Sequence, residues 1–229
     1  MIIDHIFAYP DAQSPEYAEY VVFAVAFEQE DWEYMGVDKD SLEYNPLYLE
    51  KNEFLVFRAK LNDPLYLKKF YDENEVLLKA QYWHGVTRQI FVSETRSSWP
   101  DYYKDFETSC KERSIDTLFE PLSRKDAAIR ALNEKRDGPH KMLRLKSKFG
   151  FIKGKVPFRL YAIEVDFDCY IITGGAIKIV EEMKQASNTK LELLKLDTVF
   201  KELRRAGITN KESLLDFIYE RSSQADTNS

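Results

Sequence analysis

Basic side chains are concentrated in one short stretch of the chain, between Lys135 and Arg159. This stretch contains nine lysines and arginines but a single acid, Asp137. Cations at this density favour binding of a polyanion, because each phosphate that is neutralised releases a condensed counterion. The alternative is a solvated, lysine-rich face with no partner. The basic residues are Lys135, Arg136, Lys141, Arg144, Lys146, Lys148, Lys153, Lys155 and Arg159.

The charge of the whole chain is distributed unevenly between its two halves. The chain has 229 residues and a formal net charge of −6. Residues 1–120 hold 24 acidic and 12 basic residues, whereas residues 121–229 hold 15 acidic and 21 basic residues. Such an asymmetry indicates partners of opposite charge. It also allows the acidic half to dock on the basic stretch and cover it.

Three predicted strands position the basic side chains. Residues 142–148 alternate apolar with basic side chains, as a half-buried strand does. Residues 158–165 and 169–173 follow as two apolar strands, and the turn at 166–168 joins them into a hairpin. Gly174 and Gly175 are predicted to break the third strand, as a turn or a bulge. Because strand side chains alternate, Arg144, Lys146 and Lys148 should line one face.

Residues 141–205 resemble the RelE/ParE superfamily of toxin ribonucleases, particularly its HigB-like, phage-derived members. The resemblance covers a little over a quarter of the chain. It rests on Leu143-Arg144-Leu145, Arg159-Leu160-Tyr161, Tyr170-Ile171-Ile172, the Gly174-Gly175-Ala176-Ile177-Lys178 turn and the helix that contains Lys190 to Leu194.

The resemblance implies metal-independent cleavage of mRNA, with RNA or the ribosome as partner and an antitoxin protein as a second partner. HigB-like members often carry a histidine and two adjacent lysines near the glycine turn, whereas this chain has only Lys178 there. The alternative is therefore a non-catalytic module that binds RNA or protein through a degenerate RelE-like domain.

In such cleavage the 2′-hydroxyl attacks the adjacent phosphate, and the resemblance implies catalytic roles for Arg159, Tyr161 and Lys178. Arginine binds two phosphate oxygens and stays charged, so Arg159 would hold the phosphorane. Lys146, Lys178 or Tyr161 could move the proton, and the sequence does not rank them. Arg159 and Tyr161 are two positions apart, so they should point to the same face. The residues expected to bind RNA are Arg144, Lys146, Lys148, Lys153 and Lys155.

No metal site and no cofactor are expected from the sequence. The three histidines, His5, His84 and His140, are scattered, and neither an HExxH motif nor a pair of nearby cysteines accompanies them. The chain also lacks a P-loop, and Gly174-Gly175 alone does not make a dinucleotide fingerprint.

The first half is predicted to be mixed α+β. Strands are expected at residues 2–9, 20–27, 54–61 and 88–93, although residues 20–27 could also form a short helix. A helix should begin at Asn62 or Asp63 and run to about Leu77, and Ser98 should cap a second helix that ends near Cys110. Residues 28–52 are expected to be irregular.

The second half begins near residue 120, where Pro121 breaks the chain. Helices are expected at 124–136, at 190–205 up to Gly207, and at 210–221. The predicted fold class is α+β, with a RelE-like antiparallel sheet packed with helices after a mixed α+β region. The predicted domains are residues 1–120 and 121–222, followed by a disordered tail at 223–229.

Three further features predict a cytoplasmic protein with no membrane partner. The two cysteines, Cys110 and Cys169, lie far apart in the chain, which is typical of a reducing compartment. No apolar stretch approaches the ~18 residues that a membrane helix needs. The first residues carry no basic leader and no cleavage site of a secretory signal.

Overall fold

The computed structural model describes residues 1–9, 19–81, 85–112, 119–121, 141–145, 158–179 and 183–227. Within these residues the chain has an α+β fold with one mixed sheet of six strands, in the order β1-β2-β6-β5-β4-β3. The strands are β1 (Ile2–Tyr9), β2 (Tyr20–Ala26), β3 (Phe119–Pro121), β4 (Lys141–Leu145), β5 (Phe158–Asp166) and β6 (Cys169–Ile177).

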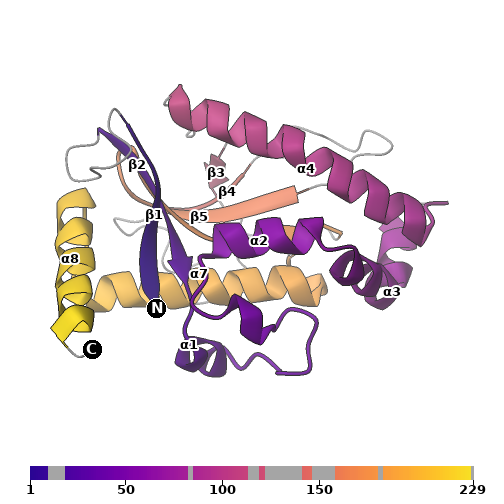
Figure 1. Ribbon diagram of the computed structural model, residues 1–229, viewed down its shortest axis with the longest axis horizontal. Coiled ribbons are helices and arrows are strands. Elements are labelled where there is room, and N and C mark those ends of the chain that lie inside the picture. Colours follow the sequence, from indigo (N-terminus) through magenta and orange to yellow (C-terminus); the bar gives the residue numbers. More distant parts are fainter. Residues whose placement is uncertain are drawn as a thin grey trace.

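Helices cover both faces of the sheet, so the molecule has three layers (Figure 1). The α-helices α2, α3 and α4 pack on one face, and α1, α7 and α8 pack on the other. The helical elements are α1 (Gln29–Tyr34), η1 (Pro46–Tyr48), α2 (Glu53–Asn62), α3 (Pro64–Gln81), α4 (Arg88–Lys111), η2 (Met183–Gln185), α7 (Ser187–Arg205) and α8 (Lys211–Thr227).

One sheet joins the two halves of the chain. β2 from the first half pairs in parallel with β6 from the second half, from Val21–Cys169 to Ala24–Ile172. The other strand pairs, β1–β2, β3–β4, β4–β5 and β5–β6, are antiparallel. The boundary predicted near residue 120 therefore does not divide the sheet.

Side-chain alternation along β5 builds two cores. Leu160 and Ala162 point into the core under α2, α3 and α4, whereas Tyr161, Ile163 and Val165 point into the core under α7. A strand that is buried on both faces reads as a nearly continuous apolar run, which is what residues 158–165 show.

The antiparallel sheet predicted for residues 141–205 is confirmed in its described part. β4 pairs with β5, β5 pairs with β6, and α7 packs against β6 and β5. The helix expected at 190–205 begins three residues earlier, and Gly207 follows it in a left-handed conformation with φ of 70°. The helix expected at 210–221 continues to Thr227, into the segment predicted to be a disordered tail. The helix predicted at 124–136 lies outside the described residues.

The strand predicted at residues 54–61 is wrong, because this segment is α2. The Asn52 side chain caps the helix by accepting a hydrogen bond from the Leu55 amide. Phe54, Phe57 and Leu61 then recur at helical spacing and lie in the core. A short apolar run is ambiguous between helix and strand, and here the cap and the spacing decide for the helix.

The strand predicted at residues 88–93 is also wrong, because it is the start of α4. Thr87 caps this helix by accepting from the Ile90 amide, and α4 then continues through Pro100 without a break. Ser98 does not cap a second helix. Its hydroxyl donates to the carbonyl of Glu94 one turn earlier instead.

Two smaller predictions also need correction. The segment 28–52, expected to be irregular, contains the short helices α1 and η1. Gly174-Gly175 does not end the third strand, since β6 runs on to Ile177. The register between β5 and β6 shifts here, from Tyr161–Gly174 to Ala162–Ile172, so Thr173 forms a bulge.

None of the helices in the described part of the chain is both long and apolar enough to cross a membrane.

Candidate functional site

The three predicted catalytic residues lie on the two central strands of the second half. Arg159 and Tyr161 are in β5, and Lys178 directly follows β6. Arg159 is 9% exposed and Tyr161 is 1% exposed, whereas Lys178 is partly exposed. Tyr161 belongs to the core under α7. Neither β5 residue therefore stands on an open face of the sheet.

The predicted RNA-binding residues fall mostly outside the described part. Arg144 is in β4, where it lies opposite Tyr161 in the β4–β5 register. Tyr161 in turn lies opposite Gly174 in β6, so the three backbone positions form one row across the sheet. Lys146, Lys148, Lys153 and Lys155 lie outside the described residues.

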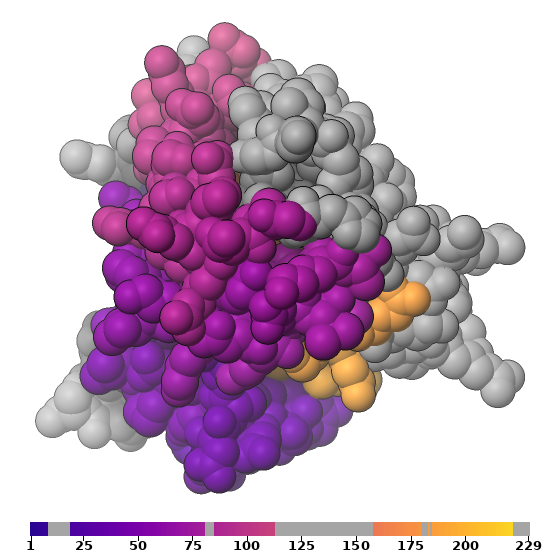
Figure 2. Space-filling view, turned by 90° about the vertical axis from the view of Figure 1, so that its right-hand side faces the viewer, coloured from indigo at the N-terminus to yellow at the C-terminus, as the bar shows by residue number. Residues whose placement is uncertain are grey.

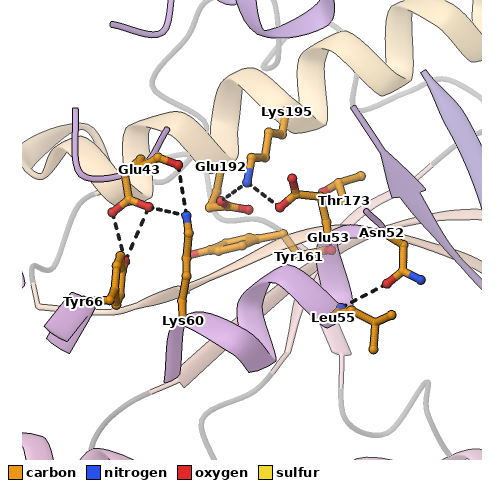
Figure 3. Close-up of polar contacts among 10 residues, drawn as sticks. All are labelled: Glu43, Asn52, Glu53, Leu55, Lys60, Tyr66, Tyr161, Thr173, Glu192 and Lys195. Carbon is orange, nitrogen blue, oxygen red and sulfur yellow. Dashed lines mark hydrogen bonds and ion pairs between the residues drawn. The ribbon is translucent and has the colours of Figure 1, made fainter. Parts of the chain in front are cut away.

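A buried set of charged side chains, here called the ionic cluster, lies beside Tyr161 and was not predicted from the sequence (Figure 3). Lys195 donates to Glu53 over 2.6 Å and to Glu192 over 2.9 Å, and all three side chains are at most 3% exposed. The Trp32 ring packs 5.4 Å from the Lys195 ammonium. The members of the ionic cluster are Glu43, Glu53, Lys60, Glu192 and Lys195.

The second ion pair of the ionic cluster joins α2 to the segment before η1. Lys60 donates to a Glu43 carboxylate oxygen over 2.7 Å and to the Glu43 carbonyl over 3.2 Å. The Tyr66 hydroxyl, on α3, donates to the same carboxylate over 3.1 Å. The ionic cluster thus ties three helices and a loop together.

The sheet opens locally to let α2 reach α7. The pairing of β2 with β6 ends at Ala24–Ile172, and β2 then makes an isolated bridge from Ala26 to Asn52, the residue that caps α2. The first turn of α2 therefore lies beside the part of β6 that β2 no longer pairs with. Glu53, in this turn, meets Lys195 of α7 directly.

Gly174 and Gly175 allow both helices to approach β6 closely. A Cβ at Gly174 would stand 2.0 Å from the Glu192 Oε2 atom, and a Cβ at Gly175 would stand 2.5 Å from the Phe57 ring. One glycine therefore accommodates α7 and the other accommodates α2. The glycine pair is explained by close packing, rather than by the end of a strand.

Gly175→Ala should lower the free energy of unfolding by about 1–3 kcal/mol, because the new methyl group overlaps a buried aromatic ring. Denaturant unfolding monitored by circular dichroism measures this loss. The double variant Gly175→Ala/Phe57→Leu should lose less than the sum of the two single variants, since the smaller side chain makes room for the methyl group. Additive losses would contradict the packing explanation.

The ionic cluster contains three carboxyl groups but only two ammonium groups. Burial alone would raise the pKa of Glu43, but the adjacent Lys60 ammonium holds it below its usual range. Burial would lower the pKa of Lys195, but Glu192 and Glu53 raise it on balance, so this side chain stays charged. Two carboxylates are thus matched by two cations.

Glu192 is the carboxyl group left over. Burial raises the pKa of Glu192 to about 7, and repulsion from the Glu53 carboxylate also raises it. The attraction of the Lys195 ammonium lowers this pKa but does not outweigh the other two effects. The Oε2 atom of Glu192 is buried and accepts no hydrogen bond from the described residues, while Oε1 accepts from Lys195. The raised pKa predicts that Glu192 takes up or releases a proton near neutral pH.

A signal for the ionic cluster was present in the sequence but was not used. Along α7, Leu196, Val199 and Leu203 are spaced to form one buried stripe. Glu192 and Lys195 continue that stripe toward the start of the helix. Charged residues at core positions of an amphipathic helix predict a buried ion pair, whose other partner the sequence does not identify.

Comparison of the chain with models of protein families, with curated proteins and with solved structures gave no match. Among the described residues, no group of three or more histidine, cysteine or acidic side chains could hold a metal ion. Cys110 and Cys169 are buried, and burial raises the pKa of each thiol to about 12, so neither is a ready nucleophile.

Proposed function

We propose that this chain binds RNA without cleaving it, through the basic stretch between Lys135 and Arg159. The observation that carries the proposal is the ratio of nine basic residues to one acid in this stretch, within a chain of net charge −6. A local excess of cations on an otherwise acidic chain favours a polyanionic partner at that place and not elsewhere.

A RelE-like domain over residues 141–205 belongs to the same proposal. The antiparallel order β4-β5-β6, followed by α7 on one face, supports it. The basic strand β4 lies next to β5 toward one side of the sheet, and only β3 lies beyond it. RNA on this side would not need to enter the core.

The burial of Arg159 and Tyr161 supports binding over catalysis. A residue that holds the phosphorane or takes the proton from the 2′-hydroxyl must reach the substrate within hydrogen-bonding distance. Tyr161 is 1% exposed and Arg159 is 9% exposed, so a bound RNA would not reach either without rearrangement of the core. Lys178 alone is partly exposed, and one lysine does not supply an acid, a base and an anion site.

Binding to a short single-stranded RNA should weaken steeply between about 50 and 200 mM salt, because phosphate contacts release counterions. Changing Arg144, Lys146 and Lys148 together to Glu should weaken binding at least ~10-fold at low salt and flatten the salt dependence. Fluorescence anisotropy with labelled RNA measures both effects. The same RNA should stay intact after long incubation.

A matched control is the triple change of Lys68, Lys69 and Lys104 to Glu, which reverses the same number of charges on exposed helix positions of the first half. This variant should bind RNA almost as the parent does. If both triple variants lose the same RNA affinity, the loss is explained by the change in net charge alone, and the proposal is overturned. Cleavage that Arg159→Ala abolishes would instead establish the ribonuclease.

A further inference from the structure

A cavity of about 300 Å³ lies between the loop after α1, the middle of α3 and the first turns of α7. This volume is at the lower end of the range for small-molecule sites. Figure 2 faces the side of the molecule where orange atoms of α7 meet the violet atoms of the first half of the chain. None of the described residues that line the cavity belongs to the basic stretch.

The inner wall of the cavity carries hydrogen-bond acceptors that the protein leaves open. Asn74 is nine-tenths buried, and its amide nitrogen donates to the Phe70 carbonyl, but its amide oxygen accepts no hydrogen bond from the described residues. The Ser41 hydroxyl oxygen has no hydrogen-bond partner among the described residues. Both residues line the cavity. Polar atoms that the protein leaves unpaired beside a cavity indicate a ligand that donates hydrogen bonds.

The charge of the lining is strongly negative. Asp38, Asp40 and Glu73 stand at the exposed rim, and Glu43 of the ionic cluster forms part of the inner wall. Lys60 keeps the pKa of Glu43 low, so this carboxylate is ionised at neutral pH. Lys190, at the rim, is the one basic residue among the described residues that line the cavity. Glu43 is already paired with Lys60, so the three rim carboxylates face one ammonium group, and a cation is favoured here.

The remaining wall is apolar, which narrows the chemistry of the ligand. Leu42, Leu191 and Leu194 line the cavity together with Met35 and Val37. A bare metal ion gains nothing from such a wall, and no described group of acidic or histidine side chains is close enough together to hold one. A cation with a short hydrocarbon chain uses both the carboxylates and the leucines.

We propose that this cavity binds a short aliphatic diamine. One ammonium group donates to Asn74 and Glu43 in the inner wall, the methylene chain lies along Leu191 and Leu194, and the second ammonium group meets the rim carboxylates. The site takes amines rather than metal ions because its acceptors are spread along a hydrocarbon wall.

Titration calorimetry of the full chain with 1,4-diaminobutane should show one binding site. Asn74→Leu, which removes the open acceptor at nearly constant volume, should weaken binding at least ~10-fold, as expected for losing a hydrogen bond to a charged group. The double variant Asp40→Asn/Glu73→Gln should weaken it similarly. Circular dichroism melting of each variant checks that it is folded, and the Tm of the parent should rise with the diamine.

Three controls keep the result specific. The double variant Asp101→Asn/Glu112→Gln removes the same charge from an exposed position of α4 and from the exposed residue that follows this helix, both outside the cavity lining, and should bind the diamine as the parent does. Mg²⁺ and 1-butanol, a cation without a chain and a chain without a cation, should each bind far more weakly. Absence of diamine binding at millimolar concentration, equal binding of Mg²⁺, or equal losses in both double variants would overturn the proposal.

Discussion

Lys195→Met should destabilise the protein by about 3–5 kcal/mol, the largest effect expected of any single substitution outside the aromatic core. The lysine is 2% exposed and is the direct partner of two buried carboxylates, Glu53 at 2.6 Å and Glu192 at 2.9 Å. Methionine fills a similar volume but leaves both carboxyl groups without a cation. A buried charge that has lost its partner costs far more than the intact pair contributes.

Denaturant unfolding compares this variant with Lys201→Met on the same helix. Lys201 also pairs with an acid, Asp197 at 2.8 Å, but its side chain is 49% exposed. Exposed pairs contribute little, so Lys201→Met should cost less than ~1 kcal/mol. Equal losses in the two variants would show that the ionic cluster is not an energetic unit.

The triple variant Lys195→Met/Glu53→Gln/Glu192→Gln tests the cause of the loss. It removes the cation and both anions together, so no buried charge remains unmatched. It should recover most of the stability that Lys195→Met loses, because apolar or neutral replacements of a whole buried ion pair are often close to neutral. A triple variant as unstable as Lys195→Met would instead point to packing around the lysine stem.

The strands β4 and β5 and the helix α7 could be predicted because each carries a clear local signal. Each of these elements has a pattern that fits one kind of structure: apolar and basic residues alternate in β4, β5 is a continuous apolar run, and the leucines of α7 recur at helical spacing. The same method failed at residues 54–61 and 88–93, where apolar residues are frequent enough to satisfy two periods. At these two segments the helix-capping residues Asn52 and Thr87 distinguish a helix from a strand.

The ionic cluster could not be predicted because its members are distant in sequence. Glu53 and Lys195 are 142 positions apart, and they meet only because β2 leaves β6 at Ala24 and lets α2 approach α7. The point at which β2 and β6 stop pairing cannot be predicted from a single sequence. The Gly174-Gly175 pair was visible, but its reason, the closeness of Glu192 and Phe57, follows from the same three-dimensional arrangement.

The prediction that Arg159 and Tyr161 point to the same face of β5 is not tested for Arg159. Strand alternation is consistent with Tyr161 pointing toward α7, as its place in that core shows. The sequence did not show that this face of β5 is covered, because the spacing in α7 predicts a helix but not the face of the sheet on which it packs. A strand with one arginine among apolar residues looks half-exposed until the covering helix is placed.

The stability of the protein should fall as pH rises from 5 to 8, and Glu192 should be the cause. Burial raises the pKa of this carboxyl group to about 7, above its ordinary value of 4.5. A group whose pKa is raised in the folded state contributes stability that is fully present below its unfolded pKa. That contribution is lost as pH rises through the folded pKa. Between pH 5 and pH 8 the loss should be about 2 kcal/mol.

The variant Glu192→Gln should remove this pH dependence while keeping the acceptor that Lys195 uses. The neighbouring groups that face Glu192 are Lys195 on its own helix, Glu53 and Lys60 on α2, and Tyr66 on α3, and all of them remain. The useful quantity is the difference between parent and variant in free energy of unfolding, measured by urea denaturation at several pH values. His5, whose pKa burial lowers, acts in the opposite direction and cancels in this difference.

The difference in free energy of unfolding between Glu192→Gln and the parent should have one sign, and a control variant should not show it. Relative to the parent, Glu192→Gln should gain stability as pH rises from 5 to 8, because glutamine has no proton to lose in the core. Glu220→Gln, at an exposed position of α8, should follow the parent at every pH. If the parent and Glu192→Gln run parallel across this range, the carboxyl group does not titrate near neutral pH.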